Sequence, residues 1–380
     1  MPSNEILIRV DSQTFQRCRL NFASLQRSFA VPVAVVGAPL GLPPIPGWVG
    51  VSGQRFLLEV GKACWRPDVL DDPGRLFALF KYATAISGRR AVFSLSDSIG
   101  DLDTHKKKVL SDELGCGMSF VIASIVYGVS RFLDFENARR LGLVTTSAPR
   151  SKQPDYLGDL DDGSLIVLEA KGTLGARTYC RSRQIASGCA QVASVTIPSQ
   201  RTVRSRIVVG TAFRRESQTQ GTQAYLGDPD PHEAYDYRFL EDLSTLPSRL
   251  HYLRVAALTG DAVVASVLMN RDFAADERAL IRRSVAGQEF LGSQLLVEGG
   301  GYRLGVFVGL QEGYRHSLLD RNFRRLREQR IEGSGIDLLR DAPTFFPEED
   351  SSFGEPVQQG ETLALSEDGT AWVTWLERGP

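Results

Sequence analysis

The chain has 380 residues, a formal net charge of −1 and 42% hydrophobic residues, enough for two or three domains with large buried cores. Its five cysteines are scattered without C-x-x-C spacing and its four histidines are isolated, so the sequence does not support a disulfide framework, a zinc site or a Ser-His-Asp triad. Residues 1–10 lack the apolar run of a signal peptide, and we expect a soluble, cytoplasmic protein without membrane contact.

Residues 1–100 predict a separate α+β region. Short apolar runs of four to eight residues are typical of strands. A segment with repeated prolines cannot pair within a β-sheet, because proline has no backbone N–H to donate. We expect strands at 6–10, 31–37, 55–60 and 91–95, a proline-rich loop at 37–53 and a short helix at 73–84. None of these segments carries recognisable chemistry.

The next predicted element is a helix from Ser111 to Tyr127. Ser111 is a suitable N-cap, and the acids that follow it suit the positive end of a helix. The helix is apolar at three- and four-residue spacing but shorter than a membrane span, so we expect it to be buried. The basic run at 105–108 predicts a solvated loop, with contact to a nucleic-acid backbone as the alternative.

Residues 154–171 carry the strongest signal in the chain. Two apolar-patterned runs, 156–160 and 165–170, flank the dipeptide Asp162-Gly163. Asp-Gly between two such runs predicts a β-hairpin.

This hairpin gathers two carboxylates and one ammonium group. With Asp-Gly as the loop, the numbers of opposed residues sum to about 325, which places Asp155 opposite Ala170 and beside Glu169 and Lys171. Two neighbouring carboxylates are stabilised by a hard divalent cation, Mg2+ above all, and a lysine beside them can orient a water molecule. The alternative is a surface hairpin in which Glu169 and Lys171 form an i, i+2 ion pair.

The residues Pro154, Asp155, Glu169 and Lys171 resemble the signature of the PD-(D/E)XK nuclease superfamily, which has a restriction-endonuclease-like fold. The resemblance covers residues 111–215 and implies that Asp155, Glu169 and the Ala170 carbonyl hold Mg2+, with Mn2+ as a substitute. It implies that Lys171 positions the attacking water. It also implies an extra acid from the preceding helix, for which Glu113 is the matching residue; the alternative is an acid in the first turn that faces water.

A second helix is expected at 176–194. The stretch 172–215 contains no Asp or Glu but eight arginines, which is typical of a phosphate-binding surface. Some nucleases of the resembled superfamily carry Gln-x-x-x-Tyr on this helix, but here the fourth residue after Gln184 is glycine, so the motif is incomplete. The nucleic-acid-binding residues that we predict on this helix are Arg177, Arg181, Arg183 and Gln184.

Residues 217–380 predict a largely helical region with small hairpins and an acidic tail. We expect a loop at 217–237 and helices at 237–270 and 276–288. The arginine-rich stretch 320–330 is either a second contact to a nucleic-acid backbone or an ordinary exposed helix. Gly-rich and Asp-Gly turns predict hairpins around 298–301 and 367–370, and residues after 341 are strongly acidic.

The sequence therefore predicts an α/β protein with a restriction-endonuclease-like core at 101–216, a mixed sheet flanked by helices. The expected activity is Mg2+-dependent hydrolysis of phosphodiester bonds, with DNA favoured over RNA as the partner. By analogy with how such nucleases are used, a mobile-element or antiviral defence system, a protein partner or a homo-oligomer is expected. One alternative is a nucleic-acid-binding or assembly subunit that keeps the fold without cleavage. The other, a small-molecule enzyme, has no nucleotide-binding loop to support it.

Overall fold

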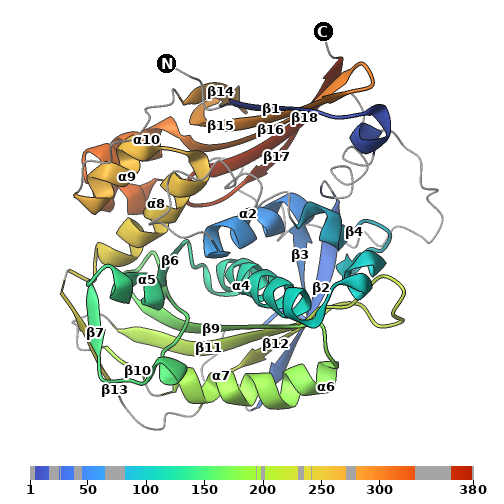
Figure 1. Ribbon diagram of the computed structural model, residues 1–380. Coiled ribbons are helices and arrows are strands. Elements are labelled where there is room, and N and C mark those ends of the chain that lie inside the picture. Colours follow the sequence, from blue (N-terminus) through green and yellow to red (C-terminus); the bar gives the residue numbers. More distant parts are fainter. Residues whose placement is uncertain are drawn as a thin grey trace.

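A computed structural model describes residues 5–16, 25, 27–37, 45–64, 82–193, 195–197, 202–229, 235–240, 242–270, 280–329 and 361–378. These residues form a mixed α/β structure in which two sheets lie on either side of a layer of buried helices (Figure 1). Another helical segment covers the outer face of the larger sheet. The predicted α/β class is confirmed.

The larger sheet has seven strands and mixes parallel with antiparallel pairs. Strand β9 pairs antiparallel with β8 and parallel with β11, so the predicted hairpin lies inside the sheet. In spatial order the strands are β3 (Trp48–Ser52), β2 (Ser28–Val36), β12 (Gln223–Gly227), β11 (Val203–Ala212), β9 (Leu165–Thr173), β8 (Tyr156–Asp159) and β6 (Arg131–Asp134).

The N-terminal strands β2 and β3 belong to this sheet. Strand β2 pairs with β12, which lies in the stretch that was predicted to be a loop, so the boundary predicted near residue 100 does not divide the sheet. The run 55–60 is also not a strand, because it lies within helix α2 (Gly53–Cys64). Helix α2 is buried between the two sheets, and its charged residues Arg55, Glu59 and Lys62 recur at helical spacing and pair with one another.

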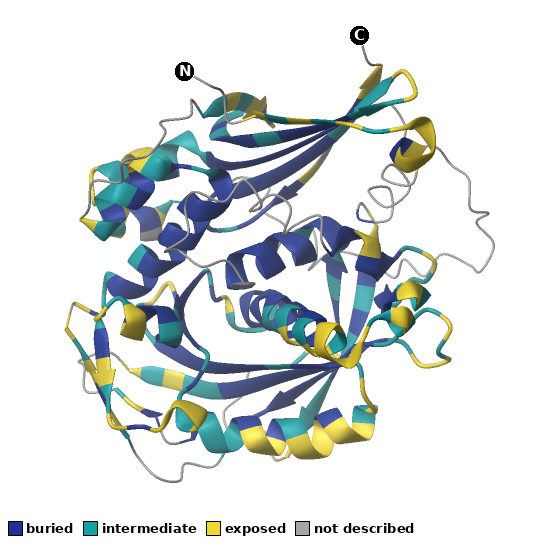
Figure 2. Cartoon of the chain, viewed as in Figure 1, coloured by how far each residue is buried: buried dark blue, intermediate teal, exposed yellow. Residues whose placement is uncertain are grey.

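Helix α4 (Thr104–Tyr127) lies beside α2 in the buried layer (Figure 2). It begins seven residues earlier than predicted, because Asp103 caps it through the backbone N–H of Lys106. The basic run 105–108 therefore lies in its first turns and not in a loop. The helix ends at Tyr127 as predicted, before Gly128 with φ of 73°.

The length and composition of α4 would also suit a membrane span. However, 67% of its most apolar 18-residue window is buried inside the protein. The helix is therefore part of the core, as predicted.

The β8–β9 turn has a three-residue loop, 161–163, in which the N–H of Leu160 donates to the carbonyl of Ser164 and the N–H of Gly163 donates to the carbonyl of Leu160. Gly163 has φ of 83°, which is typical of the last loop position in such a turn. After β9, the predicted helix at 176–194 is confirmed as a continuous segment. It consists of α6 (Arg177–Tyr179), the π-helical turn η4 (Cys180–Gln184) and α7 (Ile185–Val192).

The second sheet has six strands and replaces the mainly helical region that was predicted. Both predicted hairpins are confirmed as β15–β16 and β17–β18, but they join each other and the N-terminal strand β1. The helix predicted at 276–288 is wrong where the structure describes it, because that segment contains β14. The strands are β1 (Glu5–Arg9), β14 (Ile281–Val285), β15 (Gln288–Gly299), β16 (Tyr302–Gln311), β17 (Glu361–Leu365) and β18 (Thr370–Arg378).

Helices α8 (Leu246–Thr259) and α9 (Ala262–Met269) occupy part of the stretch 237–270 that was predicted to be helical. Helix α8 packs against both β6 and β16, so it bridges the two sheets. The remaining elements are η1 (Ala83–Ala85), β4 (Ile86–Ser87), β5 (Ser94–Leu95), η2 (Asp97–Asp101), α5 (Phe135–Arg140), β7 (Val144–Thr146), η3 (Arg150–Lys152), β10 (Val195–Thr196), β13 (Tyr235–Phe239), α10 (Glu312–Leu319) and α11 (Phe323–Glu328). The helix predicted at 73–84 and the acidic residues 342–360 lie largely or wholly outside the described residues.

Candidate active site

Asp155, Glu169 and Lys171 meet where β8 begins. The backbone N–H of Asp155 donates to Oε2 of Glu169 at 3.1 Å, and the N–H of Ala170 donates to Oδ2 of Asp155 at 3.0 Å. The Lys171 ammonium group forms a hydrogen-bonded ion pair with Oε1 of Glu169. The hairpin therefore brings the predicted trio together.

The register of the hairpin differs from the predicted one by a single position. Tyr156 is paired with Leu168, so Asp155 lies opposite Glu169 and not opposite Ala170. The reason is the loop, which has three residues and not two. Directly opposed residues on antiparallel strands share a face, so the shift brings the two carboxylates closer than predicted.

The charges of the trio are strongly coupled. Burial raises the pKa of the Glu169 carboxyl well above its ordinary value, the charge of Asp155 adds to this, and Lys171 opposes it. Burial also raises the pKa of Asp155, and the positive charge of Lys171 opposes this shift as well. Burial alone would lower the pKa of Lys171, but Glu169 and Asp155 outweigh it and the pKa is raised. Lys171 is therefore protonated at neutral pH.

Helix α7 covers the inner part of the site. A Cβ atom on Gly188 would lie 3.2 Å from Cγ of Glu169 and 2.5 Å from a methyl group of Val208, so this position leaves room for little more than glycine. The Glu169 side chain is 0% exposed, whereas that of Lys171 is 24% exposed. Solvent therefore reaches the trio from the side of Lys171 and Asp155.

The donor set fits a hard divalent cation, although no group of three or more His, Cys, Asp or Glu side chains suited to hold a metal occurs among the described residues. Asp155 and Glu169 supply two carboxylates that repel each other, and a divalent cation would relieve that repulsion. A third oxygen is available from the backbone. The N–H of Ala170 points to Asp155, and in an extended strand the carbonyl of the same residue points to the same edge.

Glu113 lies on α4 about 60° around the helix from Cys116, whose thiol pKa responds to the charge of Asp155, and its part in the site stays a prediction. A Cβ atom on Gly115 would lie 2.7 Å from Cα of Gly172, so this side of α4 touches β9 next to Lys171. Glu113 is two residues from Gly115 and therefore points about 160° away around the helix.

Asp112 and Cys116 lie nearer to this contact, and sequence reasoning did not assign them to the site. Burial raises the pKa of Asp112, and the charges of Lys108 and Lys171 oppose the shift. Burial, assisted by the charge of Asp155, raises the pKa of the Cys116 thiol to about 12. The sequence feature that could have indicated this side of α4 is the pair of glycines, Gly115 and Gly172, which lets the helix approach strand β9 closely.

The four predicted nucleic-acid-binding residues have different environments. Arg177 donates to the carbonyl of Gly221, and Gln184 donates through Nε2 to the carbonyl of Gly172 at 3.1 Å. The Oε1 atom of Gln184 is buried and accepts no hydrogen bond from the described part of the protein. Arg181 and Arg183 are exposed. Gln184 thus contacts the strand that carries Lys171, whereas Arg181 and Arg183 face solvent.

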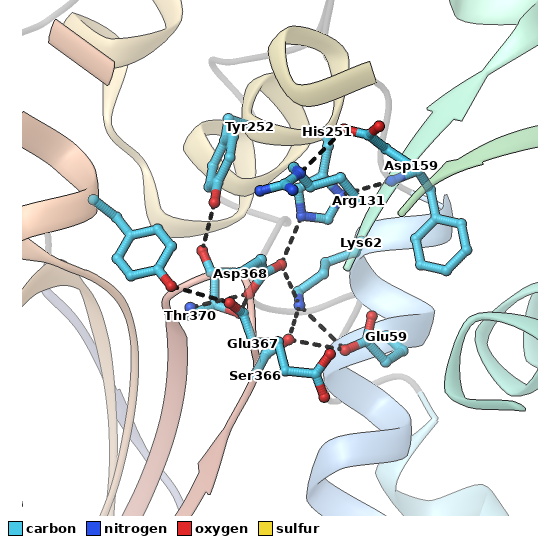
Figure 3. Close-up of polar contacts among 12 residues, drawn as sticks. Glu59, Lys62, Arg131, Asp159, His251, Tyr252, Ser366, Glu367, Asp368 and Thr370 are labelled. Carbon is cyan, nitrogen blue, oxygen red and sulfur yellow. Dashed lines mark hydrogen bonds and ion pairs between the residues drawn. The ribbon is translucent and has the colours of Figure 1, made fainter. Parts of the chain in front are cut away.

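A second cluster of charged side chains lies between α2, α8 and the β17–β18 turn (Figure 3). Nζ of Lys62 lies 2.7 Å from Oδ2 of Asp368 and 3.2 Å from Oε1 of Glu59. His251 accepts from the N–H of Phe132 through Nδ1, so Nε2 carries the proton that it shares with Asp368 at 2.7 Å. Burial lowers the pKa of His251, which keeps the imidazole neutral.

This cluster is closed to solvent. Lys62, His251 and Asp368 are each 0–2% exposed, and both nitrogens of His251 already have partners. Burial would raise the pKa of Asp368, but the charge of Lys62 and the hydrogen bond from His251 hold it well below the ordinary range. The cluster joins elements and does not present a reactive group.

Comparisons of the chain with family models, with curated proteins and with solved structures find no match.

Proposed function

We propose that the chain is a metal-dependent nuclease that hydrolyses phosphodiester bonds, most readily in DNA. The observation that carries the proposal is the convergence of Asp155, Glu169 and Lys171 at one end of the hairpin, with two hydrogen bonds that fix the carboxylates. The order of elements supports it as well. Helix α4, hairpin β8–β9, helix α6–α7 and strand β11 follow one another as a restriction-endonuclease-like core requires.

The residues of the chain have distinct roles in this proposal. Asp155, Glu169 and the Ala170 carbonyl would hold Mg2+, which when bound supplies a polarised phosphoryl oxygen and a water of lowered pKa. Because Lys171 is protonated, it donates a hydrogen bond to that water or to the developing negative charge and does not act as a base. Asp155 and Lys171, which are the more exposed members of the trio, contact the substrate.

The test is cleavage of linear and circular DNA by the full chain with Mg2+, Mn2+ or Ca2+. We expect Mg2+ and Mn2+ to support cleavage and Ca2+ to support it poorly, because Ca2+ prefers more ligands and looser geometry. Asp155→Asn, Glu169→Gln and Lys171→Met should each reduce the rate by about 10²-fold or more. A matched control is Glu298→Gln, which removes the carboxylate of an ion pair with Arg303 in the other sheet. Cleavage in EDTA, or wild-type rates in folded variants of the trio, would refute the proposal.

A nucleic-acid-binding subunit without cleavage is the second candidate. The observation that favours it is the complete burial of Glu169, whose two oxygens accept from Lys171 and from the Asp155 backbone. Binding of DNA without cleavage under any of the three cations would support this candidate over the nuclease.

A further inference from the structure

The outer face of α6–α7 combines an exposed aromatic ring with exposed arginines. Tyr179 is 50% exposed, and Arg183, four residues further along the helical segment, shares its side, whereas Arg181 is exposed on the other flank. Figure 2 shows exposed residues along the outer face of this segment. No acid occurs between residues 172 and 215. An exposed tyrosine that lies among cations without neighbouring acids is the composition of a surface that binds nucleic acid.

The arginines of this stretch divide into those that stabilise the fold and those that face solvent. Arg206 donates to the carbonyl of Val195 at 3.0 Å, and Arg204 lies 3.6 Å from a carboxylate oxygen of Asp162. In contrast, neither Arg181 nor Arg183 forms a hydrogen bond or ion pair within the described ranges of the chain. Their charges are therefore available to a partner.

The basic surface continues from α6 to the ends of strands β11 and β12. Burial raises the pKa of Tyr225 in β12, and the positive charges of Arg177, Arg181 and Arg214 all oppose this shift. Three guanidinium groups from two separate segments therefore lie near one point of the surface. Such a concentration of positive charge favours a partner with closely spaced negative charges, as a phosphate backbone has.

This surface lies close to the catalytic candidates. Gln184 contacts the carbonyl of Gly172, the residue after Lys171. Tyr179 precedes Gln184 by five residues, which corresponds to about 7.5 Å along a helix. The π-helical turn η4 lies between the two, and such turns occur frequently at functional sites. One nucleic-acid strand can therefore contact Tyr179 and the trio together.

We propose that Tyr179 is a stacking platform for an unpaired base, that Arg183 beside it binds a phosphate next to that base, and that Arg181 on the other flank of the helix binds a phosphate further along the strand. The faces of bases in a duplex are covered by their neighbours, so a side chain can stack only on a single strand or a flipped base. The ligand of this surface is therefore a single-stranded segment. For cleavage this inference rests on the proposed nuclease function, with single-stranded DNA or a single-stranded branch as the substrate. For binding it stands independently.

The experiment measures binding by fluorescence anisotropy in EDTA, which prevents metal-dependent cleavage, with the full chain. The probes are a single-stranded oligonucleotide and a blunt duplex of equal length. Tyr179→Ala should weaken single-strand binding by about 5- to 150-fold, whereas Tyr179→Phe, which retains the ring, should bind like the wild type. Trp48→Ala removes another exposed aromatic ring, 44% exposed on β3, and should leave binding unchanged.

Salt dependence separates stacking from charge. Tyr179→Ala should leave the slope of log affinity against log salt concentration unchanged, because no charge is removed. The double variant Arg181→Ala/Arg183→Ala should lower that slope by about 1.4, at about 0.7 for each single-strand phosphate contact. A base analogue such as 2-aminopurine at the stacked position should be quenched by the wild type and by Tyr179→Phe but not by Tyr179→Ala.

Three outcomes would overturn the inference. The first is single-strand binding by Tyr179→Ala at wild-type affinity, and the second is an equal loss for the blunt duplex. The third is competition by polyglutamate as effective as competition by the oligonucleotide, which would indicate an acidic protein partner. If the binding results hold but the wild type cleaves no DNA with any divalent cation, the proposed nuclease function fails and the single-strand site stands.

Discussion

The ammonium group of Lys62 lies 2.7 Å from a carboxylate oxygen of Asp368, and both side chains are 1% exposed. Lys62 belongs to a helix between the sheets, and Asp368 belongs to the turn of the last hairpin. Tyr252 adds a hydrogen bond from its hydroxyl to the Asp368 carbonyl at 3.0 Å (Figure 3). The turn of one sheet is therefore fixed to the helical layer that supports the other.

We predict that Asp368→Ala lowers the free energy of unfolding by about 3–5 kcal/mol, because it leaves the Lys62 charge buried without its closest partner. The control is Asp320→Ala, which breaks an exposed pair with His316 and should change the free energy by less than about 1 kcal/mol. Urea denaturation of both variants measures the difference. Equal stability of Asp368→Ala and the wild type would show that the buried pair does not hold the turn.

Without divalent cations, Glu169→Gln should stabilise the protein at neutral pH. Folding raises the pKa of Glu169, so the folded state binds the proton more tightly than the unfolded state. The resulting stabilisation is fully present below the unfolded pKa of about 4.3 and is lost as pH rises through the folded value. Thermal unfolding in EDTA between pH 4 and pH 8 should therefore show a steeper decrease for the wild type than for Glu169→Gln. Parallel curves would mean that burial does not shift this carboxyl.

Divalent cations should reverse this order of stability, because they stabilise the wild type and not Glu169→Gln. A cation that binds only the folded wild type adds about 2.7 kcal/mol at a concentration one hundred times its Kd. Mn2+ should therefore raise the melting temperature of the wild type by several degrees and leave Glu169→Gln almost unchanged. The readout does not require activity, and an equal shift in both proteins would place the cation elsewhere.

Gly172→Ala should displace helix α4 from the sheet. The new Cβ atom would lie 1.7 Å from the carbonyl oxygen of Ser111, a backbone atom that cannot move alone. We expect a loss of about 3 kcal/mol or more in the free energy of unfolding. Gly47→Ala is the control, because nothing lies within 4 Å of its added Cβ atom. A wild-type unfolding midpoint for Gly172→Ala would contradict the close helix–strand contact.

Asp112→Asn should slow cleavage about tenfold or more, because the charge of Asp112 interacts with Lys171 from across the helix–strand contact. Glu113→Gln, one residue further along α4, should change the rate by less than about threefold, because its side chain points away from that contact. Rates under Mg2+ compare the two variants. The reverse order would restore Glu113, the residue predicted from sequence, as the acid from this helix.

Local signals predicted the hairpin, because an Asp-Gly turn between apolar runs defines its own partner strand. The end of α4 at Tyr127 was also predictable, since a glycine follows directly. The strand β12 was not, because its segment is polar at both ends and becomes a strand only through pairing with β2 and β11, which are distant in sequence. Helix α2 was missed because the short, mostly apolar run at 56–60 resembles a strand, although the helical spacing of Arg55, Glu59 and Lys62 indicates a helix.

The residues of the candidate site also fall into those that local sequence predicts and those whose position depends on the folded chain. Asp155, Glu169 and Lys171 were predictable since one hairpin carries all three. Asp112 was not, because its position depends on where the helix begins and on which of its faces touches the sheet. The cluster around Asp368 has no local signature, because its members come from three segments that meet only in the folded chain.

The pairing of β2 with β12 determines how the molecule can be divided. A fragment limited to residues 101–216 would contain β11 but lose β12, its antiparallel neighbour on the side away from β9. The apolar residues Val208 and Val209 would then lie on a new sheet edge with unpaired backbone N–H and carbonyl groups, which invites aggregation. The smallest fragment that retains both neighbours of β11 must extend through β12, and one that leaves no new edge must also include the N-terminal strands β2 and β3.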